Sequence, residues 1–348
     1  PGNDPANNLV FLLTLTAVIT AVDRHASLLR ATVASAGNDL RLGANEAPPA
    51  IVSIFLGEEL TSLMEMLSGG QKKAKNCGEA LNMDSTQLPK LPKDISDRNR
   101  TSPFAFTGNK FEFRMAPSSE SISTAVAVLN AAVASVFQEL ADKLEKSSCV
   151  EDDIYTLVAE YWQKHNRIVF NGNGYSGEWV KEAERRGLPN LADSVKAFSA
   201  WAETVNTGML KSQGIFAHGE LEAIHHVEYE TYTKRILIEA KTMVEMLERY
   251  ILPAVREYTM ELGDWSMMLQ DLGNADAEAA GSERVTAFME HYAVLEREFS
   301  QLKQSTAALS HSCKPHKEQA SDCRETLIPI MARTRNASDT VEALMPAE

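Results

Sequence analysis

The stretch "RNRTSPFAFTGNKFEFR", residues 98–114, carries more information about the fold than any other part of the chain. Its last five residues alternate between charged and aromatic side chains. In an extended strand this alternation places Lys110, Glu112 and Arg114 on one face and Phe111 and Phe113 on the other. The sequence therefore predicts a half-buried strand that displays three charged groups together.

Two interpretations of this charged face remain open. A carboxylate between two cations can bind a divalent metal while the cations hold an anionic substrate, as phosphoryl transfer requires. The same residues can instead form a surface ladder of ion pairs with neighbouring strands, which is the more common outcome for an isolated Lys-x-Glu-x-Arg. Arg41 and Glu46 lie in one loop and Arg100 in another, and both loops precede strands that could pair. Such pairing would gather these charges and favour a binding site.

The rest of the chain predicts an α+β protein in which a region of strands and helices is followed by a mostly helical C-terminal region. We place the boundary between 1–225 and 226–348, with a variable insertion near 68–97 that is rich in Gly, Lys, Asp and Pro. "FNGNGYS" lacks the spacing of a phosphate-binding loop and favours a structural turn. The expected elements are a helix capped by Asn7 or Asn8, a strand over 50–57, helices over 228–262 and 282–309 that pack antiparallel, and a short helix after Arg324 near Pro329. The tryptophans expected in the core are Trp162, Trp179, Trp201 and Trp265.

Composition excludes several classes of protein. The formal net charge of -14 and the lack of clustered Lys and Arg argue against binding to nucleic acid or to an anionic membrane. The four cysteines show no CxxC pair and no His at zinc spacing, so we expect free thiols in a reducing, cytoplasmic compartment, although Cys313 and Cys323 could close a loop under oxidation. The apolar run near the N-terminus is interrupted by threonines and has no basic residues ahead of it, which favours a buried helix over a signal or anchor.

Three stretches resemble the C-terminal half of type III glutamine synthetases. They are "ASAGNDLRLGANEAPPAI" (34–51), "RNRTSPFAFTGNKFEFR" (98–114) and "GNGYSGEWVKEAERRGLPNL" (172–191). The resemblance implies part of a glutamine synthetase catalytic domain, which uses ATP and Mg or Mn to join ammonia to L-glutamate through γ-glutamyl phosphate and gives L-glutamine. It also implies that the N-terminal β-grasp domain and the first part of the catalytic domain are not among these residues, so we expect an incomplete antiparallel sheet with helices. We therefore expect the 348-residue chain alone to be inactive, and the full-length protein to be a homo-oligomer, commonly a dodecamer of two hexameric rings.

The resemblance also implies roles for six residues. Arg41 and Arg114 correspond to arginines that bind the substrate glutamate or its phosphorylated intermediate. Glu46 corresponds to the flap glutamate that takes a proton from ammonium, and Arg100 to the arginine that stabilises the transferring phosphoryl group. The remaining two are Lys110, near the nucleotide phosphates, and Glu112, a ligand of the metal that bridges them.

The sequence departs from the commoner bacterial forms at three points. The loop from Arg41 to Glu46 is one residue shorter, Ala105 stands in place of an arginine, and Lys110 replaces another arginine. A lysine offers a point charge with less directional control than a guanidinium. These departures keep a second interpretation open, in which the chain is a non-catalytic glutamine synthetase-like protein with a regulatory or structural role.

Overall fold

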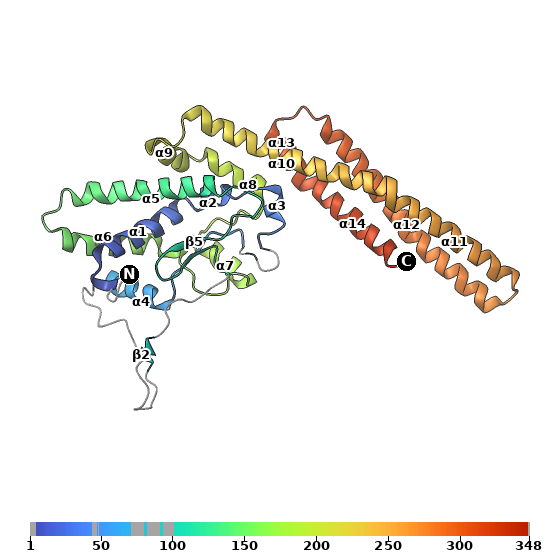
Figure 1. Ribbon diagram of the computed structural model, residues 1–348, viewed down its shortest axis with the longest axis horizontal. Coiled ribbons are helices and arrows are strands. Elements are labelled where there is room, and N and C mark those ends of the chain that lie inside the picture. The colour runs from blue at the N-terminus through green and yellow to red at the C-terminus, as the bar shows by residue number, and fades with distance from the viewer. Residues whose placement is uncertain are drawn as a thin grey trace. The chain divides into compact units, whose positions relative to one another are not determined.

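A computed structural model describes residues 5–43, 47, 49–70, 80–81, 91–92 and 101–346. The chain divides into two compact units, Pro1–His225 and His226–Glu348, which we call unit 1 and unit 2 (Figure 1). Glu46, Arg100 and most of the predicted insertion lie outside the described residues.

Unit 1 contains a three-stranded sheet in the order β1-β4-β5. β1 (Ile54–Phe55) pairs parallel with β4 (Phe104–Phe106), and β4 pairs antiparallel with β5 (Phe111–Phe113). The predicted α+β class is confirmed, but the sheet is mixed rather than antiparallel throughout. Parallel strands need a long crossover connection, and the chain between β1 and β4, which includes α4 (Glu58–Ser68), supplies it. Within the predicted insertion, β2 (Ala80–Leu81) pairs antiparallel with β3 (Leu91–Pro92).

The predicted alternation in β5 is present in the structure. Phe111 and Phe113 pack against the hydrophobic core, and the ring centroid of Phe111 lies 5.1 Å from that of Phe104 in the neighbouring strand. Aromatic pairs across strands are a main source of sheet stability. The charged residues of the same strand are therefore left on the opposite face.

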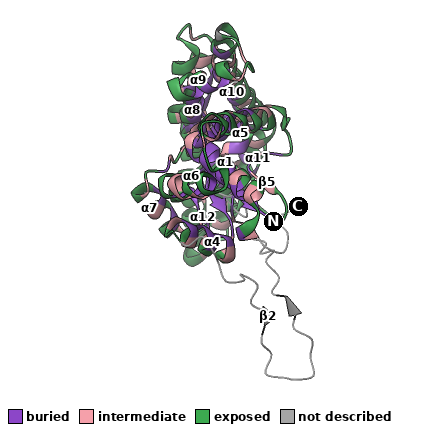
Figure 2. Cartoon of the chain, turned by 90° about the vertical axis from the view of Figure 1, so that its left-hand side faces the viewer, coloured by how far each residue is buried: buried purple, intermediate pink, exposed green. Residues whose placement is uncertain are grey.

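Helices cover the core of unit 1. α1 (Leu9–Arg24) packs against α5 (Ser123–Leu144) and α6 (Val150–His165), and α4 packs against α6 (Figure 1). Buried residues lie along α1, α5 and α6, with exposed residues on their outer surfaces (Figure 2). The other elements of unit 1 are η1 (Pro5–Asn7), α2 (Ala26–Ala31), α3 (Ala36–Asp39), η2 (Asn166–Ile168), α7 (Gly177–Arg185), α8 (Ser194–Ala197), η3 (Phe198–Ala202), α9 (Thr204–Ser212) and the first residues of α10 (His218–Met246).

Side-chain caps fix where several of these helices begin. Asn8, one of the two residues predicted to cap the first helix, caps α1. Its side chain accepts a 3.0 Å hydrogen bond from the Phe11 N–H. Ser176 caps α7, and Asp193 caps α8. A capping oxygen satisfies a backbone donor that has no partner inside the helix. These short polar residues therefore set the helix boundaries.

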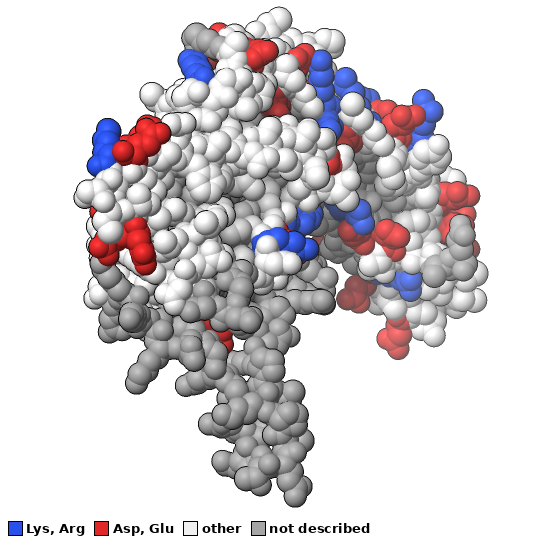
Figure 3. Space-filling model, turned by 60° about the vertical axis from the view of Figure 1, so that its left-hand side comes forward, with Lys and Arg blue, Asp and Glu red and all other residues white. Residues whose placement is uncertain are grey.

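By length and composition, α5 is the helix among the described residues that meets the requirements for crossing a membrane. It packs against α1 and buries Val128, Ala132 and Val136. The core helix of a globular domain meets the same requirements, so composition alone does not place α5 in a membrane. On the face drawn in Figure 3, the described Lys and Arg side chains lie among Asp and Glu side chains rather than in one block.

Unit 2 is built from long helices. α10 continues through a π-helical turn, η4 (Leu247–Ile251), into α11 (Leu252–Asp271), and α12 (Ala275–Ser310) returns beside it. The pairing is antiparallel, as predicted, because Lys303 bonds to Glu248 and Arg256 bonds to Glu296. The remaining elements are α13 (His316–Asp322), the π-helical turn η5 (Cys323–Leu327) and α14 (Ile328–Glu342).

Two adjacent residues make the turn of the α11–α12 hairpin. Gly273 has a positive φ of 66°, a conformation that ends helices and favours glycine. Asn274 then caps α12 by accepting bonds from the N–H groups of Asp276 and Ala277. α14 packs on α12, and Pro329 lies in its first turn, where proline is tolerated.

Candidate functional site

The three charged residues of the β5 region lie together on one face. Glu112 Oε2 is 2.9 Å from Arg114 Nη2, and Glu112 Oε1 is 3.4 Å from Lys110 Nζ. The hydrogen bond from Arg114 lowers the pKa of Glu112, with a further contribution from Lys110. The ion pairs run along one strand rather than across strands, because the residue opposite Glu112 in the register is Ala105.

The structure brings Arg41 to the end of this strand. Arg41 Nη1 donates to the Met115 carbonyl oxygen (3.0 Å), and Arg41 Nη2 donates to the Arg114 carbonyl oxygen (3.2 Å). Nη1 also donates to Asn38 Oδ1 (3.2 Å). Arg41 and Arg114, which are far apart in sequence, are therefore neighbours, and both belong to the predicted site.

These contacts leave one edge of the Arg41 guanidinium group available. Arginine has five N–H groups. The two on Nη1 and one on Nη2 bind protein acceptors. Among the residues that the structure describes, the Nε–H and the second Nη2–H have no acceptor. Together they form a planar fork that matches a carboxylate in a bidentate hydrogen bond. The fixed guanidinium is thus suited to bind a carboxylate.

Asn38 sets the position of Arg41 from within the protein. Its side chain is fully buried, and Nδ2 donates to the carbonyl oxygens of Val33 (2.6 Å) and Met115 (3.1 Å) while Oδ1 accepts from Arg41. Both amide hydrogens and the carbonyl oxygen of the side chain therefore have partners. A buried amide with all its bonds made holds one orientation.

A buried ion pair holds the α3 turn that precedes Arg41. Arg30 Nη2 lies 3.2 Å from Asp39 Oδ1, with side chains 1% and 6% exposed. Asp39 also accepts a bond from the Ser194 N–H (3.0 Å), and Arg30 Nε donates to the Leu191 carbonyl oxygen (3.0 Å). Burial raises the pKa of Asp39, while the bonds from Ser194 and the charge of Arg30 oppose that rise. The network joins α2, α3 and the start of α8.

The segment "FNGNGYS" forms a turn that connects two other parts of unit 1. Asn171 Oδ1 accepts the N–H groups of Leu56 (3.1 Å) and Gly57 (3.0 Å), just before α4 begins. The Gly174 N–H donates to Thr101 Oγ1 (2.8 Å), and a Cβ at Gly174 would lie 2.6 Å from the Thr101 carbonyl oxygen. This close approach needs glycine, and it fixes the residue that follows Arg100 in the chain.

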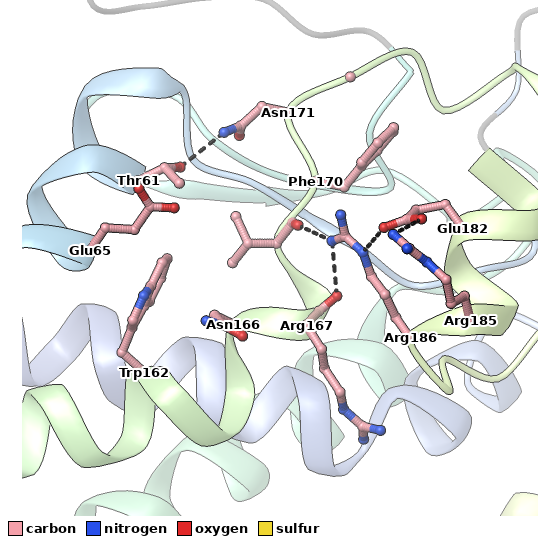
Figure 4. Close-up of a pocket in the computed structure, with 12 residues that line it drawn as sticks. Thr61, Glu65, Trp162, Asn166, Arg167, Phe170, Asn171, Glu182, Arg185 and Arg186 are labelled. Carbon is pink, nitrogen blue, oxygen red and sulfur yellow. Dashed lines mark hydrogen bonds and ion pairs between the residues drawn. The ribbon is translucent and has the colours of Figure 1, made fainter. Parts of the chain in front are cut away.

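A cavity of about 720 Å³ lies elsewhere in unit 1, between α4, the end of α6 and α7 (Figure 4). Its arginines already have partners: Arg185 and Arg186 share the Glu182 carboxylate, and Arg186 Nη1 also donates to the Val169 carbonyl oxygen (2.7 Å). The residues that line it do not include Arg41, Lys110, Glu112 or Arg114. The cavity is therefore separate from the charged face of β5.

The predicted metal ligand, Glu112, belongs to no larger group of metal ligands among the described residues. Within the described part of the chain, no group of three or more His, Cys, Asp or Glu side chains is arranged to hold a metal ion. Mg²⁺ and Mn²⁺ prefer several oxygen ligands, and both carboxylate oxygens of Glu112 face cations. These residues alone do not fit a divalent metal site.

Sequence reasoning identified the charged residues but not those that position them. Arg41, Lys110, Glu112 and Arg114 lie in the described residues and gather around β5, whereas Glu46 and Arg100 lie outside them. Asn38 and Asp39 stood in the quoted "ASAGNDLRLGANEAPPAI" motif, directly before Arg41. Their only signal was that short polar residues beside a binding residue often fix its loop.

Comparison with known proteins gives a consistent result. Residues 153–269 match the family model described as the glutamine synthetase C-terminal domain. The type-3 glutamine synthetase of Dictyostelium discoideum is 41% identical over 257 residues, which cover 73% of this chain and 35% of that protein. Glutamine synthetases of Butyrivibrio fibrisolvens and Bacteroides fragilis (strain YCH46) are 35% and 33% identical over 99% and 98% of this chain, and 49% and 48% of their own lengths. The chain thus spans between a third and a half of the length of these relatives.

Proposed function

This chain belongs to the glutamine synthetase family, and we propose that it supplies the part of the catalytic site that binds L-glutamate and the phosphates of ATP. In the proposed reaction the γ-phosphoryl group of ATP moves to the side-chain carboxylate of glutamate. Ammonia then displaces phosphate from γ-glutamyl phosphate to give L-glutamine.

The observation that best supports this proposal is the geometry of Arg41. Its guanidinium is held by two successive carbonyl oxygens and by Asn38, and the fork that remains is suited to a substrate carboxylate. A positioning arginine of this kind lowers the entropic cost of orienting the substrate. Arg114, whose own carbonyl oxygen accepts a bond from Arg41, adds a second cation for the same anionic substrate.

The other residues have proposed roles at the phosphates. Lys110 is exposed at the start of β5 and can place its ammonium group against the nucleotide. We assign Arg100 to the transferring phosphoryl group and Glu46 to proton removal from ammonium, both on the strength of the family resemblance. The metal needs oxygen ligands beyond Glu112, so we derive no step through it and propose that the 348 residues alone do not turn over.

The direct test is an assay of glutamine formation by the native protein that carries this chain. In Arg41→Lys and Arg114→Lys variants we expect the KM for L-glutamate to rise by about 10-fold or more, since losing a bidentate charged contact costs more than about 1.4 kcal/mol. The KM for ATP should stay within about 2-fold, because the loss is confined to the carboxylate contact. Arg335→Lys, at an exposed position of α14 in unit 2, serves as the matched control.

Three results would count against the proposal in different ways. Unchanged KM values would refute the site assignment while leaving the activity intact. ATP binding without glutamine formation by the native protein would favour the non-catalytic alternative, for which Ala105 in place of a phosphate-contacting arginine is the supporting observation. Phosphate release by the 348-residue chain alone would refute its proposed inactivity.

Sedimentation of the native protein would test the homo-oligomer that the family resemblance implies.

A further inference from the structure

The tip of the α11–α12 hairpin differs in composition from the rest of unit 2. We define the hairpin tip as residues 257–283, which include no Lys, Arg or His. It has seven acidic residues, so it carries half of the formal net charge of -14. They are Glu257, Glu261, Asp264, Asp271, Asp276, Glu278 and Glu283.

The carboxylates of the hairpin tip have no ion-pair partner among the residues that the structure describes. Two arginines make the side-chain bonds between α11 and α12 that lie nearest the tip. Arg256 bonds to Glu296 and Tyr292, and Arg284 bonds to the Tyr258 hydroxyl group (3.3 Å). Asp276 and Glu278 lie in the first turn of α12, where the helix dipole favours acidic side chains. The other five carboxylates have no such local explanation.

Large apolar side chains are exposed on the same tip. Five of them are between 37% and 69% exposed, namely Met260, Trp265, Met267, Met268 and Leu272. Trp265 was expected in the core, and this expectation is wrong. Within the tip, the buried residues are Tyr258, Leu262 and Gly281. The two helices meet there so closely that a Cβ at Gly281 would lie 2.8 Å from Leu269 Cδ1.

Acidic and apolar residues alternate along one face of α11. Met260, Asp264, Met267 and Asp271 follow one another at spacings of three or four residues, which places them on the same side of the helix. Exposed apolar surface of this kind marks an interaction site more often than a free surface. Methionine is common at such surfaces because its flexible side chain adapts to the partner.

The charge of the tip determines the chemistry of its partner. Carboxylates without counter-cations repel anionic lipid, nucleic acid and the identical tip of a second copy. They attract Lys and Arg, which can cover the methionines with their aliphatic portions. We propose that the hairpin tip is a docking surface for a basic amphipathic helix of another protein. An amphipathic helix places its apolar face on the methionines and its cations beside the carboxylates.

The proposal can be tested on the full chain with a synthetic amphipathic helix of leucine and lysine as the probe, by isothermal titration calorimetry. The apolar variant is Met267→Ser with Met268→Ser, and its control is Ile238→Ser with Met246→Ser on the same continuous helix. The charge variant is Glu257→Gln with Glu261→Gln, and its control is Glu325→Gln with Glu342→Gln. All eight positions are exposed.

We expect each tip variant to weaken peptide binding by about 10-fold, the effect of removing a central interface contact. Both controls should stay within about 2-fold of the unmodified chain, and affinity should fall with rising salt. Failure of the unmodified chain to bind the peptide would overturn the proposal. An equal loss of peptide affinity in the charge variant and its control would also overturn it, because the peptide would then be attracted to the acidic protein as a whole. A smaller sedimenting species for the apolar variant, with peptide affinity unchanged, would assign the surface to contact between copies.

Discussion

Arg30 in unit 1 and Arg335 in unit 2 each pair with an aspartate, but their surroundings differ. The Arg30–Asp39 side chains are 1% and 6% exposed, whereas those of Arg335 and Asp339 are 72% and 48% exposed. A buried pair is expensive to break, because either partner alone becomes an unpaired charge in an apolar environment. An exposed pair within one helix contributes little. Charge therefore fixes backbone position in unit 1 and remains available to solvent or a partner in unit 2.

Tryptophan shows the same difference between the two units. Trp179 is 1% exposed and stacks on Phe170 with ring centroids 3.8 Å apart, whereas Trp265 is 37% exposed on the hairpin tip. The two residues both lie on helices at apolar positions in the sequence. Only their surroundings make one a core residue and the other a surface residue.

The largest expected effect separates these two tryptophans. Trp179→Ala should lower the free energy of unfolding by about 4 kcal/mol, because it removes a large buried ring and leaves a cavity. Trp265→Ala should lower the free energy of unfolding by about 1 kcal/mol, because the substitution removes only the partial packing of this side chain against α12. Urea titration followed by circular dichroism measures both. Equal losses for the two variants would contradict the assignment of Trp265 to an exposed surface.

A somewhat smaller effect should separate the two ion pairs. Asp39→Ala should cost about 3 kcal/mol of stability, because it leaves the buried Arg30 without its carboxylate. Asp339→Ala, the matched control, should cost less than about 0.5 kcal/mol. Thermal unfolding of both variants provides the comparison.

Restoring apolar packing sharpens this test. In the double variant Arg30→Met with Asp39→Leu no unpaired charge remains, so much of the lost stability should return. A double variant as unstable as Asp39→Ala would show that shape, rather than charge, governs this site.

The last comparison predicts opposite signs of the stability change at two glycines. Gly174→Ala should destabilise the protein by about 1 to 3 kcal/mol, because the new Cβ would meet the Thr101 backbone. Gly263→Ala lies in the interior of α11, where a new Cβ would have no neighbouring atom within 4 Å, and it should stabilise the protein by about 1 kcal/mol. Chemical denaturation of the two variants checks the signs. Destabilisation by Gly263→Ala would mean that another chain packs closely against that helix.

Local patterns predicted the elements that depend on local physics. The alternation over residues 110–114 predicted a strand with Phe111 and Phe113 on the core side, and the structure confirms it. Helical spacing predicted the antiparallel pair in unit 2, although both helices are longer than expected because Gly273 and Asn274 alone end one helix and begin the next. Parallel pairing of β1 was not predicted, since strand direction depends on a crossover that periodicity does not report.

Residue type together with the resemblance of three motifs identified the charged side chains of the candidate site, and the alternation of β5 determined that Lys110, Glu112 and Arg114 share a face. Only the tertiary structure placed Arg41 beside Arg114, with three of its N–H groups bound to described residues and the other two without a described acceptor. Likewise, only the tertiary structure left Trp265 exposed while burying Trp179. The physical reason is common to both cases: spacing along a strand or helix sets the direction of a side chain, whereas its partners and burial depend on which distant segment packs against it.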